Sequence, residues 1–208
     1  MLFDFDGVVV LSEHLYDVAT QEMARQLGIS IPASFNARMR GQSDRVFFDA
    51  LKSEFQVEIP SDDLYELGRN ILKTTFAQTV THTPGYVDFH TRIRNRGWRS
   101  GLVTSTPRPL LEYIFEHSDL DTGFEYIITV DDVKHPKPHP EPYLAMCRLV
   151  GTEPSRAVVI EDSPAGVQAA RAAGCQVVAI TTSSDPKSLA EADFVVDSFA
   201  AVSELLPF

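Results

Sequence analysis

The sequence has few cysteines and no long apolar run, and both shortages exclude classes of protein. Its 208 residues contain two cysteines, Cys147 and Cys175, without a Cys-x-x-Cys spacing. Neither a disulfide framework nor a zinc knuckle is therefore indicated. No apolar stretch approaches the roughly 20 residues that a membrane span needs, and the first residues have no signal-like basic or apolar region. The sequence predicts a cytoplasmic protein without a membrane partner.

Basic residues are also scarce. Eighteen Lys and Arg stand against 29 Asp and Glu, a formal net charge of −11. This balance argues against a nucleic-acid-binding protein with a broad basic surface, but a small phosphorylated substrate needs only a local cluster of charge. The 44% hydrophobic and 23% charged composition is typical of a globular chain of one or two domains.

From about residue 99 onward, short apolar runs alternate with helical patterns, which indicates repeated β-α units and a parallel sheet. The predicted strands are residues 101–103, 126–130, 157–160, 176–180 and 194–196. Thr106-Pro107 and Ser163-Pro164 each offer an N-cap followed by proline at the first helical position. An earlier strand, residues 1–3, begins the chain.

Residues 12 to about 80 contain no strand-like run. Three helical segments are predicted there, beginning at Ser12, Ser43 and Ser61. The fold prediction is therefore an α/β Rossmann-like core, a parallel sheet with helices on both faces, plus a small all-helical cap inserted after the first strand. We assign residues 1–11 and 82–208 to the core and residues 12–81 to the cap.

In an open parallel sheet, ligands bind beyond the carboxyl ends of the strands. The polar residues that follow the predicted strands are Asp4, Asp6, Thr104, Ser105, Thr106, Glu161 and Asp162, with Lys137 in the loop after the third strand. Four carboxylates at neighbouring strand ends repel one another unless a cation neutralises them. We therefore expect these side chains to form one site that contains a positive charge.

This set of residues suits phosphoryl transfer with a hard metal ion. Carboxylate oxygens are the ligands that Mg²⁺ prefers, and Mg²⁺ keeps part of its octahedron for water and phosphate. A carboxylate left over could act as a nucleophile. Lys137 and the Thr104 hydroxyl could hold the phosphate oxygens. The sequence thus predicts a Mg²⁺ cofactor and a phosphorylated substrate.

The same residues resemble the four ordered motifs of the haloacid dehalogenase superfamily. These are Asp4-Phe-Asp6-Gly7-Val8, the strand-terminal Thr104, Lys137-Pro-His-Pro, and Glu161-Asp162-Ser-Pro-Ala-Gly166. The order and spacing are similar to the branch of phosphatases and beta-phosphoglucomutases with a small helical cap. The resemblance covers nearly the whole chain, including the position of the cap after the first motif.

The resemblance implies a role for each matching residue. Asp4 would be the nucleophile that forms an aspartyl-phosphate, and Asp6 the acid that protonates the leaving oxygen and then the base that activates water. Thr104, the backbone at Ser105, and Lys137 would bind the phosphoryl group.

The metal ligands also follow from the resemblance. Asp4, the Asp6 carbonyl and Asp162 would hold Mg²⁺, and Glu161 would order a water on the metal. Dehalogenation is disfavoured, because that branch needs no metal and lacks the second Asp of the first motif, which is present here as Asp6.

The choice between phosphatase and mutase depends on the cap. Mutases of this branch carry a histidine about twelve positions after the nucleophile, where this sequence has Tyr16, and His14 would face away from that position. The mutase cap also has an arginine soon after a glycine. Here Asp44 stands at that spacing from Gly41, and Arg45 follows one position later. Both departures favour transfer of the phosphoryl group to water, with Tyr16 and Arg45 as candidate substrate contacts.

The sequence thus predicts a Mg²⁺-dependent phosphatase of a small phosphorylated metabolite, with a sugar phosphate favoured. An intramolecular phosphosugar mutase and a non-catalytic binding protein are the alternatives. Oligomeric state is left open, and a monomer is compatible with the sequence. The histidines, including His135 and His139, follow no established metal-ligand spacing and are expected to be solvated or hydrogen-bonded.

Overall fold

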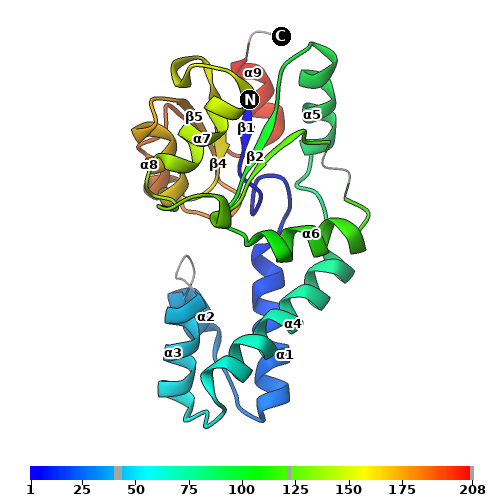
Figure 1. Cartoon of the computed structure of the whole chain (residues 1–208), viewed down its shortest axis with the longest axis vertical. Coiled ribbons are helices and arrows are strands. Elements are labelled where there is room, and N and C mark those ends of the chain that lie inside the picture. The colour runs from blue at the N-terminus through cyan, green and yellow to red at the C-terminus, as the bar shows by residue number, and fades with distance from the viewer. Residues whose placement is uncertain (40–43, 121–122, 207–208) are drawn as a thin grey trace. The chain divides into compact units, whose positions relative to one another are not determined.

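The computed structural model describes residues 1–39, 44–120 and 123–206. Contacts divide the chain into two compact units, one formed by residues 1–11 with 81–208 and the other by residues 12–80. Figure 1 shows that the first unit contains the strands and that the second is helical. The helical unit is inserted in the chain after the first strand and its turn.

The α/β unit is built on one six-stranded parallel sheet. Its strands are β1 (Leu2–Phe3), β2 (Gly101–Val103), β3 (Tyr126–Ile128), β4 (Val158–Glu161), β5 (Gln176–Ile180) and β6 (Phe194–Val196). Their order in the sheet is β3-β2-β1-β4-β5-β6, so β1 is central. The chain adds β2 and β3 on one side of β1 and then β4, β5 and β6 on the other. This reversal beside β1 is the topological switch point, where such sheets bind ligands. The α/β parallel fold predicted from the sequence is confirmed.

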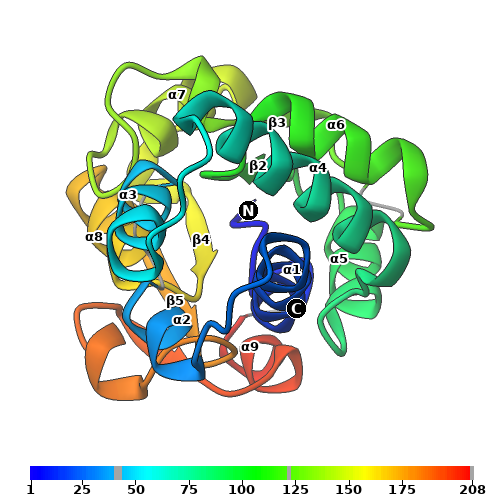
Figure 2. The same ribbon diagram turned by 90° about the horizontal axis from the view of Figure 1, so that it is seen from below.

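Helices cover both faces of this sheet (Figure 2). They are α5 (Tyr86–Asn95), α6 (Arg108–His117), α7 (Glu141–Val150), α8 (Pro164–Ala172) and α9 (Phe199–Leu205), with short 3-10 turns η1 (Val130–Asp132), η2 (Pro154–Arg156) and η3 (Pro186–Leu189). Leu2 belongs to the apolar cluster shared with α7 and α8. Its neighbour Phe3 instead packs against Tyr86 and Phe89 of α5. Successive β1 residues thus face opposite layers, and both faces of the strand are buried.

The helical unit packs around its own apolar core. Its helices are α1 (Glu13–Leu27), α2 (Ala33–Met39), α3 (Asp44–Phe55) and α4 (Ser61–Thr79). The fully buried side chains at the centre include Phe35, Leu51 and Leu64. Among the described helices of the whole chain, none combines the length and the apolar character needed to cross a lipid bilayer.

Some local expectations were wrong. Helix α2 was not predicted, because its seven residues are too few to show a clear helical period. Ser12 precedes α1, yet its hydroxyl makes no cap hydrogen bond and has no hydrogen-bond partner among the described residues. Ser43 lies outside the described residues. Helix α6 begins at Arg108, after Pro107 rather than with it, and β3 ends at Ile128.

Candidate active site

The first part of the site follows β1. Asp4 is buried, and its N–H donates a 3.0 Å hydrogen bond to the carbonyl of Ile160 in the adjacent strand β4. The chain then turns at Gly7, whose φ of +72° is rarely adopted by other residues. A Cβ atom on Gly7 would overlap the Asp162 carboxylate. Glycine at this position therefore lets the turn lie directly against the end of β4.

The second part of the site is the end of β4. Glu161 is the last residue of β4 and Asp162 follows it; both are buried. The parallel register aligns Phe3 with Ile160, so the residue after each lies at the same edge of the sheet. One carboxylate oxygen from each of Asp4, Glu161 and Asp162 lies within 4.8 Å of the others. Pairing of two strands that are distant in the sequence is what creates this cluster.

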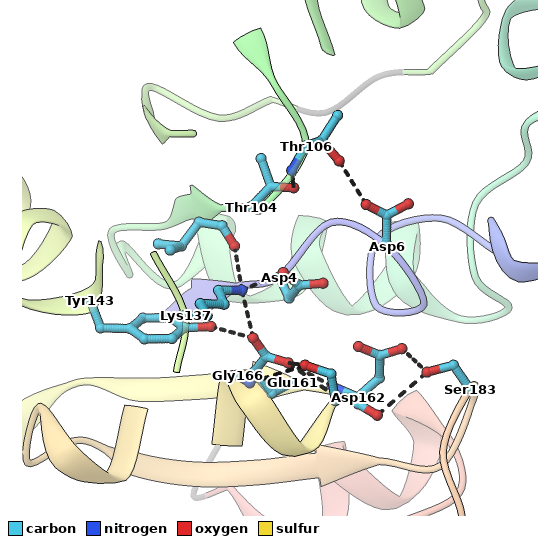
Figure 3. Close-up of polar contacts among 12 residues, drawn as sticks. Asp4, Asp6, Thr104, Thr106, Lys137, Tyr143, Glu161, Asp162, Gly166 and Ser183 are labelled. Carbon is cyan, nitrogen blue, oxygen red and sulfur yellow. Dashed lines mark hydrogen bonds and ion pairs between the residues drawn. The ribbon is translucent and has the colours of Figure 1, made fainter. Parts of the chain in front are cut away.

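Lys137 enters the cluster from the loop after β3, and its side chain is only 4% exposed. Figure 3 shows its amino group between two carboxylates. Nζ donates to Asp4 Oδ1 at 2.5 Å, to Glu161 Oε1 at 2.6 Å and to the Val103 carbonyl at 3.0 Å. Burial would lower the pKa of Lys137, but the charges of Asp4 and Glu161 raise it above its usual value. Lys137 is therefore a permanent cation within the cluster.

Hydrogen-bond donors from the protein surround the Glu161 carboxylate. The Tyr143 hydroxyl donates to Oε1 at 2.7 Å, next to the bond from Lys137. Oε2 accepts from the N–H groups of Asp162 and Ser163, at 3.1 and 3.2 Å, and from the Ser163 hydroxyl at 3.0 Å. Burial opposes ionisation, but Lys137 lowers the pKa of Glu161 below its usual value. With five donors, this carboxylate is committed to protein contacts.

Asp6 points away from this cluster and toward the end of β2 (Figure 3). The Thr106 hydroxyl donates to Asp6 Oδ2 at 2.7 Å, and the Thr106 N–H donates to Thr104 Oγ1 at 2.9 Å. Thr104 is buried and Ser105 is exposed. Thr106 was expected to cap the following helix, but its hydroxyl orients Asp6 instead.

The charge of the cluster is not balanced by Lys137 alone. Burial raises the pKa of Asp4 to about 8; Lys137 opposes the shift, while Glu161 and Asp6 add to it. Burial, followed by the charges of Asp4 and Glu161, also raises the pKa of Asp162, whose carboxylate accepts a hydrogen bond from the Ser183 hydroxyl. Crowded oxygen ligands that ionise reluctantly are the environment that a hard divalent cation relieves. The residues present therefore fit a Mg²⁺ ion.

The raised pKa of Asp4 predicts a pH dependence of stability for the protein in EDTA. Between pH 4 and 8 the folded state holds a proton on Asp4 that the unfolded state has lost, because the unfolded pKa is 3.8. The free energy of unfolding should therefore fall as the pH rises through this range and level off above it. Urea midpoints measured from pH 4 to 9 test this. The Asp4→Asn variant is the control, and an equally steep fall in that variant would contradict the assignment.

Gly166 of α8 packs directly against Glu161, and a Cβ atom there would overlap the carboxylate. We expect Gly166→Ala to destabilise the fold by about 1 to 3 kcal/mol, the usual cost of overpacking a buried site. Displacing Glu161 should also move Lys137. Urea unfolding measures the effect, with Gln168→Ala on the exposed side of α8 as the control. A Gly166→Ala protein of unchanged stability would show that the carboxylate has room to move.

The two candidate substrate contacts lie in the helical unit. Tyr16 of α1 is 41% exposed, and its ring packs edge-to-face on Phe76 of α4, with the ring centroids 5.2 Å apart. Arg45 of α3 is well exposed, and its Nε lies 3.8 Å from Asp49 Oδ2. Gly41, from which the arginine spacing was counted, lies outside the described residues.

Three contacts of the α/β site were missed by sequence reasoning. Tyr143 stands among apolar residues of its helix and is buried there, but its hydroxyl donates to Glu161. A single hydroxyl on an otherwise apolar face was the available signal. The Ser183 hydroxyl donates to Asp162 and comes from the loop after β5. Because parallel strands end at one edge of the sheet, the position of Ser183 after a strand could have identified it. For the bond between Thr106 and Asp6, the sequence carries no signal.

Comparisons with known proteins agree with this architecture. Residues 1–180 match the family described as haloacid dehalogenase-like hydrolase. The validoxylamine A 7'-phosphate phosphatase of Streptomyces hygroscopicus subsp. limoneus is 30% identical over 201 residues, which cover 97% of this chain and 94% of that protein. Hexitol phosphatase A of Escherichia coli (strain K12) is 30% identical over 205 residues, covering 97% and 92%. A solved structure from Thermotoga maritima, provisionally assigned as a beta-phosphoglucomutase, has a TM-score of 0.87 at 27% identity, covering 99% of this chain and 98% of that one.

Proposed function

Because the chain belongs to the haloacid dehalogenase-like hydrolase family, we propose that it is a Mg²⁺-dependent phosphatase of a small phosphorylated metabolite, with a sugar phosphate favoured. The observation that carries this proposal is the cluster of Asp4, Lys137, Glu161 and Asp162 at one edge of the sheet. The named activities of the two curated relatives, both phosphatases, support it.

Asp4 is the proposed nucleophile. Its Oδ1 accepts the hydrogen bond from Lys137, which leaves Oδ2 as the attacking atom. In the first step Oδ2 forms a bond to phosphorus and the bond between phosphorus and the substrate oxygen breaks. In the second step a water oxygen attacks the aspartyl-phosphate, which releases inorganic phosphate and restores the Asp4 carboxylate.

Asp6 is the proposed acid and base. Its carboxyl group gives a proton to the leaving substrate oxygen in the first step and takes one from the attacking water in the second. The Thr106 hydroxyl, 2.7 Å from Asp6 Oδ2, holds the carboxyl group in one orientation. Asp6 is thus kept apart from the Asp4 cluster and ready to meet the leaving group.

Lys137, the Thr104 hydroxyl and the backbone N–H of Ser105 are the proposed ligands of the transferred phosphoryl group. Asp4, the Asp6 carbonyl and Asp162 are the proposed ligands of Mg²⁺. When bound, Mg²⁺ supplies positive charge that keeps these carboxylates ionised and offsets charge on the phosphoryl oxygens. Glu161, whose carboxylate already accepts five hydrogen bonds, holds Lys137 in place and adds negative charge beside the metal.

The helical unit, residues 12–80, is the proposed cap and the source of substrate specificity. Tyr16 and Arg45 are its candidate substrate contacts. Because the position of the mutase histidine is occupied by Tyr16, we favour water over a sugar hydroxyl as the phosphoryl acceptor.

A substrate panel tests the activity. The protein is incubated with sugar and polyol phosphates, with Mg²⁺ or with EDTA, and inorganic phosphate is measured. We expect release of phosphate with Mg²⁺ and none with EDTA. Isomerisation of a hexose 1-phosphate that depends on a bisphosphate primer would instead establish a mutase, the assignment of the Thermotoga maritima structure. Binding of sugar phosphates without turnover would establish a non-catalytic protein.

A further inference from the structure

A second group of metal-ligand side chains lies on the loop that carries Lys137, outside the carboxylate cluster. It consists of His135, His139 and Glu141, the last being the first residue of α7. One ring nitrogen from each histidine and one carboxylate oxygen lie within 4.8 Å of one another. The centroids of the two imidazole rings are 4.7 Å apart. Both histidines are exposed, so an ion from solvent can reach them.

Backbone hydrogen bonds hold the Glu141 carboxylate in position beside the two histidines. Its Oε1 accepts from the N–H of Lys134 at 2.9 Å and its Oε2 from the N–H of His135 at 3.1 Å. These two bonds and the His135 ring lower the pKa of Glu141, so the carboxylate is ionised at neutral pH. A carbonyl-type oxygen has two lone pairs, so Oε1 keeps one for a further partner.

The two imidazoles are also oriented. His135 Nδ1 lies 2.8 Å from Glu141 Oε2, so these two candidate ligand atoms already face each other. The N–H of Glu141 donates to His139 Nδ1 at 3.2 Å, which places the second ring beside the first.

We infer that His135, His139 and Glu141 bind a divalent transition-metal ion of the Zn²⁺ type, separately from the Mg²⁺ site. Two imidazole nitrogens with one carboxylate oxygen suit Zn²⁺, whereas the buried cluster of Asp4, Glu161 and Asp162 offers oxygen alone. Three protein ligands leave a fourth position for water. Lys137 lies between the two histidines in the sequence. The bound ion therefore links the loop segments that precede and follow Lys137.

Isothermal titration of the full-length, EDTA-treated protein with Zn²⁺ tests this, in the presence of excess Mg²⁺ to occupy the carboxylate cluster. We expect one Zn²⁺ per chain and a loss of affinity of at least about tenfold in the double variant His135→Ala, His139→Ala. The visible absorption of bound Co²⁺ should disappear in the same variant.

Two matched variants separate this site from others. His117→Ala removes an exposed histidine of α6 and should bind Zn²⁺ as the unmodified protein does. Asp4→Asn alters the carboxylate cluster and should also retain the Zn²⁺ site. The inference is overturned if the unmodified protein binds no Zn²⁺, if the double variant binds it equally well, or if Asp4→Asn abolishes binding. None of these outcomes depends on phosphatase activity.

Discussion

Replacing Asp4 with asparagine should reduce turnover at least about 1000-fold, because the amide cannot form the aspartyl-phosphate. The fold should persist. The amide oxygen of the new side chain can still accept the hydrogen bond from Lys137, and Lys137 keeps Glu161 as an ion-pair partner at 2.6 Å. In EDTA the variant should be at least as stable as the unmodified protein, because burial, with the charges of Glu161 and Asp6, makes the charged form of Asp4 unfavourable despite Lys137. Phosphate release and urea unfolding measure the two effects.

The combination of lost turnover and kept stability is what identifies a nucleophile. Substrate binding, measured by titration of Asp4→Asn with the best substrate of the panel, should remain. Turnover close to that of the unmodified protein would exclude the covalent mechanism. Loss of turnover together with loss of folding would show instead that Asp4 is a structural residue.

Replacing Lys137 with methionine should have the largest effect on stability. Its amino group is the cation that touches both Asp4 and Glu161, and its side chain is 4% exposed. Removing one partner of a buried ion pair typically costs about 3 to 5 kcal/mol, because the remaining charges are buried without compensation. Turnover should also fall by about 100-fold or more, since the proposed mechanism loses a preorganised donor to the phosphoryl group. Chemical unfolding and phosphate release test both expectations.

The matched control is Lys134→Met, a lysine of the same loop that is exposed. This variant should retain stability and turnover, because the Lys134 side chain is exposed and its backbone N–H, the donor to Glu141, is unchanged by the substitution. If Lys137→Met and Lys134→Met behave alike, Lys137 is not the counter-ion of the cluster. Mg²⁺ should recover part of the stability of Lys137→Met, because it can supply the missing positive charge.

Much of the α/β site was predictable because it follows from a topological rule. Parallel strands end at the same edge of a sheet, so the residues after β1 and β4 were expected at one edge once the strands were recognised. Asp4, Glu161 and Asp162 are accordingly neighbours, and Lys137 joins them. The apolar runs that mark these strands are local patterns, and local patterns can be read from one sequence.

Contacts that depend on the third dimension were not predictable. The hydroxyl of Thr106 looked suited to a helix start, but it bonds to Asp6, 100 positions away in the chain. Tyr143 is both a core residue and the donor to Glu161. Helix α2 forms although its sequence period is too short to detect, because Phe35 is buried in the core of the helical unit. In each case packing decides between roles that the local sequence allows equally.

The sequence by itself determined the parallel α/β architecture, the inserted helical segment and the set of residues at the strand ends, because hydrophobic periodicity and the alternation of strand-like and helical segments are local patterns. Only the tertiary structure decided which groups each carboxylate contacts. Asp6 turns to Thr106, and Glu161 is saturated by Tyr143, Lys137 and the start of α8. Burial then shifts the pKa of Asp4, and burial exists only when distant segments pack together.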